Sequence, residues 1–185
     1  MKKSTIYELS VCALMAALLC VIAPLSIPIG PVPISLATLV LYLSVHVLRT
    51  RSALISCALY LLLGAFGLPV FSGYAGGIAK LAGPTGGYLV GYLFLVLISG
   101  LFVWKSARFE KPVLRIAYSV LGMILGTAVL YIFGTIWFKI QAKVSLPYAL
   151  SVCVLPFLPG DLGKIALAAV IGRLVRKALL KAGLL

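Results

Sequence analysis

Long apolar runs, separated by short polar or Gly- and Pro-rich segments, dominate the chain. A helix that crosses a bilayer needs about 20 mostly apolar residues. The runs predict six such helices, at residues 5–25, 34–48, 52–68, 86–104, 113–136 and 160–180. The second and third are short, so we expect them to lie beside loops that enter the protein. Pro147 and Pro156 interrupt segment 145–158 and Pro159 follows it directly, which is compatible with a short outer helix before the last span.

Composition favours the membrane class. Of the 185 residues, 63% are hydrophobic and only 10% are charged, whereas a soluble domain carries about 25% charged residues. A net charge of +13 would suggest nucleic acid in a soluble protein, but here the charges lie at the ends of apolar runs. We therefore expect contact with membrane lipid and none with nucleic acid. The N-terminal run resembles a signal peptide, but it lacks a clear small-residue cleavage site, so we expect an uncleaved first helix.

The Lys and Arg residues predict the orientation. With a cytoplasmic N-terminus, twelve of them flank cytoplasmic helix ends and only three flank outer ends: Lys2, Lys3, Arg49, Arg51, Lys105, Arg108, Lys111, Arg115, Arg173, Arg176, Lys177 and Lys181 inside, against Lys80, Lys139 and Lys143 outside. This excess follows the positive-inside rule. The fold class predicted is an all-α membrane protein: a single domain over residues 1–185, a six-transmembrane-helix bundle with both termini cytoplasmic.

Two Gly- and Pro-rich polar segments interrupt the apolar pattern, at residues 64–91 and 155–164. Irregular backbone and charge at membrane depth are tolerated only where protein or a water-filled cavity surrounds them. In the predicted topology the linkers 26–33 and 69–85 and the approach to Asp161 all face outside. The sequence therefore predicts a small-molecule pocket toward the outer face.

Asp161 and Lys164 are the leading candidates for ligand contacts. Their spacing of three residues places them on one face of a helix. At about 1.5 Å per residue from Arg173, both fall near mid-depth of a hydrocarbon core about 30 Å thick. The alternative is structural: an Asp161 helix cap in the Pro159-Gly160-Asp161 sequence, with a neighbouring ion pair and no ligand.

The sequence GPTGGY, Gly83 to Tyr88, is the second candidate. Gly-rich turns expose backbone N–H groups, and Thr85 and Tyr88 add hydroxyl groups. The alternative is a tight loop into a helix whose Gly87 and Gly91 pack closely against a neighbouring helix. Lys80, in an otherwise uncharged outer loop, is either a ligand contact or a solvated lysine.

The sequence argues against catalysis and against a metal or cofactor. It holds three acidic residues and one histidine, His46, so carboxylate catalysis and a metal site are improbable. Ile165 follows Gly163-Lys164, where a nucleotide-binding Walker A motif needs Ser or Thr. The four cysteines, Cys12, Cys20, Cys57 and Cys153, lie in apolar runs and are best interpreted as small packing residues.

These segments resemble a known family. GLPVFSGYAGGIAKLAGPTGGYLVGY (67–92) and PFLPGDLGK (156–164) look like the two signatures of the BioY family, and IPIGPVPISL (27–36) is similar to its first loop. BioY proteins are biotin-specific substrate-binding subunits, called S components, of energy-coupling factor (ECF) transporters. The resemblance covers nearly the whole chain. It implies six membrane helices, an outward-facing biotin pocket and a multi-pass position in the bacterial cytoplasmic membrane.

The resemblance implies that Asp161 and Lys164 contact biotin and that the start of the GPTGGY helix lines the pocket. The biotin-binding candidates are then Asp161, Lys164, Tyr88, Thr85, Gly86, Lys80, Phe71 and Tyr74, the aromatic residues being suited to walls around the fused rings. Ala37 stands where the family often has Gln, which puts one polar contact in doubt. Whether Lys164 meets the ureido group or the carboxylate of biotin stays open.

Partner subunits are implied because the chain has no ATP-binding motif. The resemblance implies a second membrane subunit and a pair of cytoplasmic ATPases. Ala13 and Ala17 form a small-residue pair on the first helix, as Gly122 and Gly126 do on the fifth; such pairs let helices approach closely. By resemblance the first pair is the candidate docking surface. Alternatives are an S component for another vitamin and a membrane assembly protein whose polar segments are purely structural.

Overall fold

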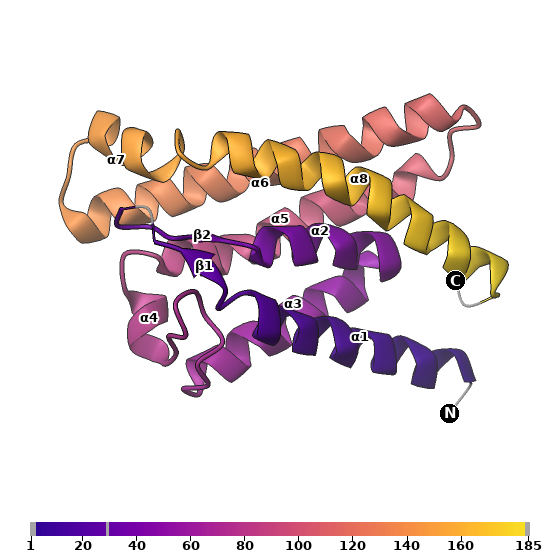
Figure 1. The fold of residues 1–185 in the computed structure, drawn as a ribbon, viewed down its shortest axis with the longest axis horizontal. Helices are drawn as coiled ribbons and strands as arrows, with labels where there is room; N and C mark the ends of the chain where they lie inside the picture. Colours follow the sequence, from indigo (N-terminus) through magenta and orange to yellow (C-terminus); the bar gives the residue numbers. More distant parts are fainter. Residues whose placement is uncertain (1–2, 29, 184–185) are drawn as a thin grey trace.

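The computed structural model describes residues 3–28 and 30–183. The elements run in the order α1 (Lys3–Ile22), β1 (Ser26–Ile27), β2 (Ile34–Ser35), α2 (Ala37–Val47), α3 (Thr50–Ala65), α4 (Ile78–Ala82), α5 (Gly86–Ser106), α6 (Pro112–Ala142), α7 (Leu146–Cys153) and α8 (Leu158–Lys181). The long helices lie side by side along one axis (Figure 1). Both ends of the chain lie at one end of this bundle, whereas the β strands, α4 and α7 lie at the other. Lys2 and Ile29 lie outside the described residues.

A helix occurs in each of the six predicted ranges, but helix length alone gives fewer membrane spans. α5 and α6 are each long and apolar enough to cross a membrane, and α7 and α8 together pass as one span bent by 46°. The apolar part of α1, α2 and α3 are shorter. An 11-residue helix such as α2 is only about 17 Å long.

The segment between the first two helices is a small hairpin, which the apolar pattern did not predict. β1 and β2 are antiparallel, with Ser26 opposite Ser35 and Ile27 opposite Ile34. The Ser35 hydroxyl donates to the Ala23 carbonyl at 2.8 Å and accepts from the Ala37 N–H at 3.1 Å. These bonds fix the hairpin between the end of α1 and the start of α2, so α2 begins three residues later than predicted.

Glycines on α5 and α6 set the closest helix packing. A Cβ atom at Gly87 would lie 2.3 Å from Cβ of Trp137, and one at Gly122 would lie 2.1 Å from Cβ of Phe102. Gly91 and Gly126 approach the neighbouring helix similarly closely. The packing interpretation of the Gly87/Gly91 pair is therefore confirmed. The Gly122/Gly126 pair also packs internally, so this pair does not form a surface for a partner.

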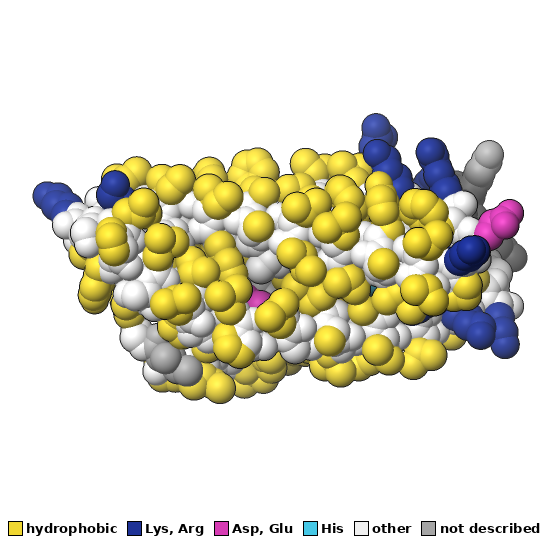
Figure 2. All heavy atoms as spheres, turned by 90° about the horizontal axis from the view of Figure 1, so that it is seen from above, with side chains coloured by type: hydrophobic (Ala, Val, Ile, Leu, Met, Phe, Trp, Pro, Cys, Tyr) yellow, Lys and Arg dark blue, Asp and Glu magenta, His cyan; other side chains and the backbone are white. Residues whose placement is uncertain are grey.

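The surface is that of a membrane protein. Large apolar side chains are exposed along the helices, with Val21 at 69% and Phe66 at 83% exposure. Figure 2 shows apolar side chains covering the middle of the molecule, while Lys and Arg side chains gather at its two ends. Most of those visible lie at the end that carries the chain termini. An apolar band between charged ends is typical of a protein embedded in a bilayer.

Candidate functional site

A buried ion pair forms the centre of the candidate site. The Lys164 ammonium donates to Asp161 Oδ1 at 2.8 Å, and both residues lie near the start of α8. Asp161 is 4% and Lys164 is 9% exposed. Their spacing on α8 brings the two side chains together on one helix face, as the sequence predicts.

Asp161 is not a helix cap. α8 begins at Leu158 and its N-cap residue is Phe157, so Asp161 lies within the first turn and its own N–H bonds to the Phe157 carbonyl. The helix starts earlier than predicted because Pro159 takes one of the first two helical positions, where its missing N–H has no effect. The carboxylate is therefore free to bond to other side chains, on α8 itself and on neighbouring helices.

Two hydroxyl groups complete the environment of the carboxylate. Thr38 Oγ1, on α2, donates to Asp161 Oδ1 at 3.2 Å, and the Tyr131 hydroxyl, on α6, donates to Oδ2 at 2.6 Å. Lys164 has two further acceptors, the Ser35 carbonyl at 2.7 Å and Thr38 Oγ1 at 3.2 Å. All three ammonium protons thus have an acceptor, and the pair is neutral as a whole. Buried charges persist when they are paired and hydrogen-bonded in this way.

A small cavity of about 40 Å³ opens beside the pair. Its walls come from the hairpin, α2, α5, α6, the α7–α8 link and α8, and the lining residues are Val32, Pro33, Ser35, Thr38, Ser72, Thr85, Tyr88, Leu89, Tyr92, Leu130, Tyr131, Phe157, Asp161 and Lys164. Small-molecule pockets typically measure about 300–1,000 Å³. A ligand of ordinary size therefore fits only if lining segments move apart. The hairpin and the loop that carries Ser72 are two wall segments that lie outside the helices.

Of the sequence-predicted residues, Thr85 and Tyr88 join Asp161 and Lys164 in this lining. The Tyr88 hydroxyl donates to the Cys153 carbonyl at 2.8 Å, and its ring stacks on Phe157 with centroids 6.4 Å apart. A Cβ atom at Gly134 would lie 2.5 Å from the Tyr88 ring, so a glycine on α6 makes room for it. The ring is thereby held as a fixed wall.

The other four predicted binding residues do not line this cavity. Phe71 is fully buried and packs edge-on against Tyr60, with centroids 5.6 Å apart. Tyr74 is 65% exposed, and Lys80 is half-buried on α4. Gly86 has a packing reason of its own, because a Cβ atom there would lie 1.6 Å from the Leu81 carbonyl oxygen.

The sequence analysis missed Thr38 and Tyr131, which bond directly to Asp161. Thr38 follows Ala37, the position where the family resemblance lacked a polar side chain, and Ala37 itself is 1% exposed. Tyr131 lies in a long apolar run on α6. The signal that could have identified it is the spacing of Thr127, Tyr131 and Thr135, which are four residues apart, so that their polar groups share one buried face of α6.

The predicted docking pair lies on the outside of α1. Ala13 and Ala17 are exposed, whereas Cys12, Ala16 and Leu19 on the other side of the helix are buried in the core. This face of α1 is therefore free to meet another helix or lipid.

Comparisons with known proteins cover nearly the whole chain. The sequence model of the BioY family matches residues 1–181. The biotin transporter BioY2 of Lactococcus lactis subsp. cremoris is 36% identical over 180 residues, covering 97% of this chain and 95% of the relative. The biotin transporter BioY of Thermotoga maritima is 35% identical over 164 residues, covering 89% and 92%. A crystal structure described as the S-component for biotin from an ECF-type ABC transporter matches with a TM-score of 0.85 and 31% identity, over 96% of this chain and 94% of that one.

Proposed function

The chain belongs to the BioY family, and we propose that the cavity beside Asp161 and Lys164 is where it holds biotin. The protein is a biotin-transport S component of an ECF-type transporter, a transport subunit and not an enzyme. The observation that carries the site assignment is the buried ion pair in a cavity lined by aromatic residues.

The chemistry of biotin matches this pair. Its ureido group offers two N–H donors and a carbonyl acceptor, and its side chain ends in a carboxylate. A carboxylate has about four acceptor positions, and Asp161 uses three of them, on Lys164, Thr38 and Tyr131. The remaining position accepts a ureido N–H without loss of an existing bond. Lys164 donates to a biotin oxygen by exchanging its bond to the Ser35 carbonyl.

Aromatic rings suit the rest of the ligand. Tyr88, Tyr92, Tyr131 and Phe157 line the cavity and offer apolar faces to the fused rings of biotin. Entry of biotin requires the β1–β2 hairpin and the loop around Ser72 to move outward. Four other predicted residues lie in or near the loop around Ser72: Phe71, Tyr74, Lys80 and Gly86. We propose that they contribute to the biotin site only after this loop has moved outward.

The topology and the partners are also proposed. Six crossings with both termini cytoplasmic are supported by the six helical regions and by the basic side chains at the end that carries the termini. We propose one membrane domain over residues 1–185, in the bacterial cytoplasmic membrane. It works with a transmembrane coupling subunit and two ATPase subunits, and the exposed face with Ala13 and Ala17 is the docking surface.

Ligand-induced stabilisation of the purified protein tests the assignment. Biotin should raise the melting temperature, whereas thiamin and riboflavin should not. Asp161→Asn should weaken biotin binding about ten- to a hundredfold, because a charge-assisted hydrogen bond contributes roughly 1.5–3 kcal/mol. Glu110→Gln is the matched control, since it also removes one carboxylate and Glu110 is exposed far from the cavity. Unchanged biotin affinity in folded Asp161→Asn protein would remove Asp161 from the site.

A further inference from the structure

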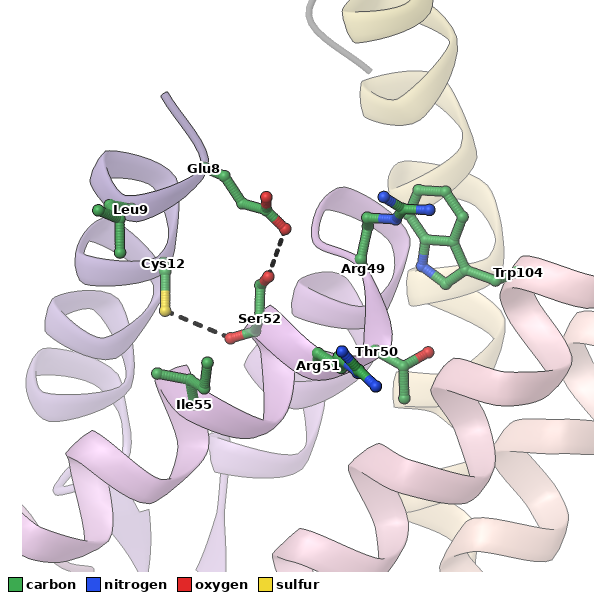
Figure 3. A pocket seen from close by; sticks show the side chains of 9 residues that line it. All are labelled: Glu8, Leu9, Cys12, Arg49, Thr50, Arg51, Ser52, Ile55 and Trp104. Carbon is green, nitrogen blue, oxygen red and sulfur yellow. Dashed lines mark hydrogen bonds between the residues drawn. The ribbon is translucent and has the colours of Figure 1, made fainter. Parts of the chain in front are cut away.

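A second and larger cavity lies at the end of the bundle that carries the chain termini. It is an open groove of about 620 Å³ between α1, the start of α3 and the end of α5. Figure 3 shows its lining residues: Glu8, Leu9 and Cys12 from α1, Arg49 to Ser52 and Ile55 from the α2–α3 link and α3, and Trp104 from α5. Biotin binding as proposed above uses none of these residues.

The floor of the groove is apolar, and hydrogen bonds between α1 and α3 fix its structure. Leu9 and Ile55 are 55% and 54% exposed, so their side chains offer apolar surface to an occupant. Beneath them the Cys12 thiol donates to the Ser52 carbonyl at 3.3 Å, which joins α1 to α3. The Ser52 hydroxyl donates to Glu8 Oε1 at 2.5 Å and holds that carboxylate against α3 (Figure 3).

The rim of the groove carries two unpaired guanidinium groups. Arg49 and Arg51 are exposed and make no ion pair or side-chain hydrogen bond with any residue that the structure describes. Both flank the start of α3, whose N-cap residue Arg49 makes no side-chain capping bond. A helix N-terminus carries a partial positive charge and free N–H groups. With one carboxylate, from Glu8, against two guanidinium groups, the groove favours a negatively charged occupant.

Neighbouring side chains place the rim at the level of lipid headgroups. The Trp104 indole donates to the Leu48 carbonyl at 2.8 Å, and the Arg176 guanidinium lies 4.0 Å from the centre of the Trp104 ring. Trp and Arg side chains concentrate at membrane–water interfaces. The bundle end that holds the groove also carries most of the basic side chains visible in Figure 2.

We propose that this groove binds one anionic phospholipid. Arg49 and Arg51 hold the phosphate and one acyl chain lies along Leu9 and Ile55. Basic pockets between membrane helices recognise anionic headgroups in this manner, whereas a soluble anion would make no use of the apolar floor. The proposal is independent of biotin, because the groove and the Asp161–Lys164 cavity share no lining residue.

The test measures lipid binding by the full chain in detergent micelles, by native mass spectrometry and by melting temperature. Phosphatidylglycerol is titrated against phosphatidylcholine of the same acyl chains. Arg49→Gln with Arg51→Gln should weaken retention of phosphatidylglycerol about 30-fold, since each basic residue near a membrane surface contributes about fivefold. Arg108→Gln with Lys111→Gln is the matched control, because it removes the same charge from exposed positions at the same end of the bundle.

A third variant separates a shaped site from general attraction. Ile55→Trp keeps every charge but fills the groove, and it should also abolish tight retention of phosphatidylglycerol. Biotin-induced stabilisation, measured on each variant, shows that the protein is folded. Equal loss in the control pair, unchanged retention in Ile55→Trp, or equal retention of phosphatidylcholine would each overturn the proposal. If the Arg49→Gln/Arg51→Gln or Ile55→Trp variants no longer co-purify with a membrane partner but retain phosphatidylglycerol as before, the groove contacts protein. That result would overturn the proposal as well.

Discussion

Removal of Lys164 tests whether the buried ion pair serves the fold, the ligand or both. Lys164→Met keeps much of the apolar stem and removes the ammonium group. Three bonds disappear: one to Asp161 Oδ1 at 2.8 Å, one to the Ser35 carbonyl at 2.7 Å and one to Thr38 at 3.2 Å. Removing one partner of a buried pair typically costs about 3–5 kcal/mol. The Asp161 carboxylate keeps its bonds from Thr38 and Tyr131, so we expect the lower end of that range, about 3 kcal/mol.

The double variant separates the two roles. Asp161→Asn added to Lys164→Met removes the unpaired charge, so the free energy of unfolding should recover most of the loss. If both side chains contact the ligand, biotin binding should be weak in Lys164→Met, in Asp161→Asn and in the double variant. The assays are denaturant unfolding in detergent and equilibrium biotin binding. Lys139→Met is the control, because Lys139 is exposed at the end of α6 and makes no ion pair in the described structure.

Two results would refute this reasoning. If the free energy of unfolding of Lys164→Met is unchanged, Lys164 does not stabilise the buried carboxylate of Asp161. Recovery of biotin binding in the double variant would show that Lys164 is only a counter-ion for Asp161 and does not touch the ligand.

Three further experiments test particular contacts. Tyr131→Phe removes the donor 2.6 Å from Asp161 Oδ2 and should lower the free energy of unfolding by about 1.5–3 kcal/mol; unchanged unfolding would contradict this. Gly86→Ala should destabilise strongly in thermal melts, because the added Cβ would lie 1.6 Å from a carbonyl oxygen of α4, whereas Gly160→Ala, with no such neighbour within 4 Å, should be tolerated. Ala13→Trp with Ala17→Trp should spare biotin binding but block co-purification with the membrane partner, since a bulky side chain separates packed helices; loss of binding with intact co-purification would place the pair in the pocket wall.

The local pattern of the sequence was sufficient for the six main helical regions and for part of their packing, but it did not predict the short helix α4. Apolar runs located six helical regions because each run must hide its backbone within a helix in a bilayer. The spacing of Asp161 and Lys164 predicted a shared face because helical geometry is local. The Gly-rich motif and its resemblance to the BioY family indicated biotin, and the comparisons confirm that family.

Tertiary structure decided which partners those residues meet. Thr38 lies 123 positions from Asp161 in the sequence, and Ser35 lies 129 positions from Lys164. No local pattern relates such distant residues, because they meet only through the packing of α2 against α8. The same holds for the groove of Arg49 and Arg51, whose apolar floor combines α1 and α3. Local sequence determines helices because their hydrogen bonds join near neighbours, whereas sites depend on side chains that only the assembled bundle brings within reach.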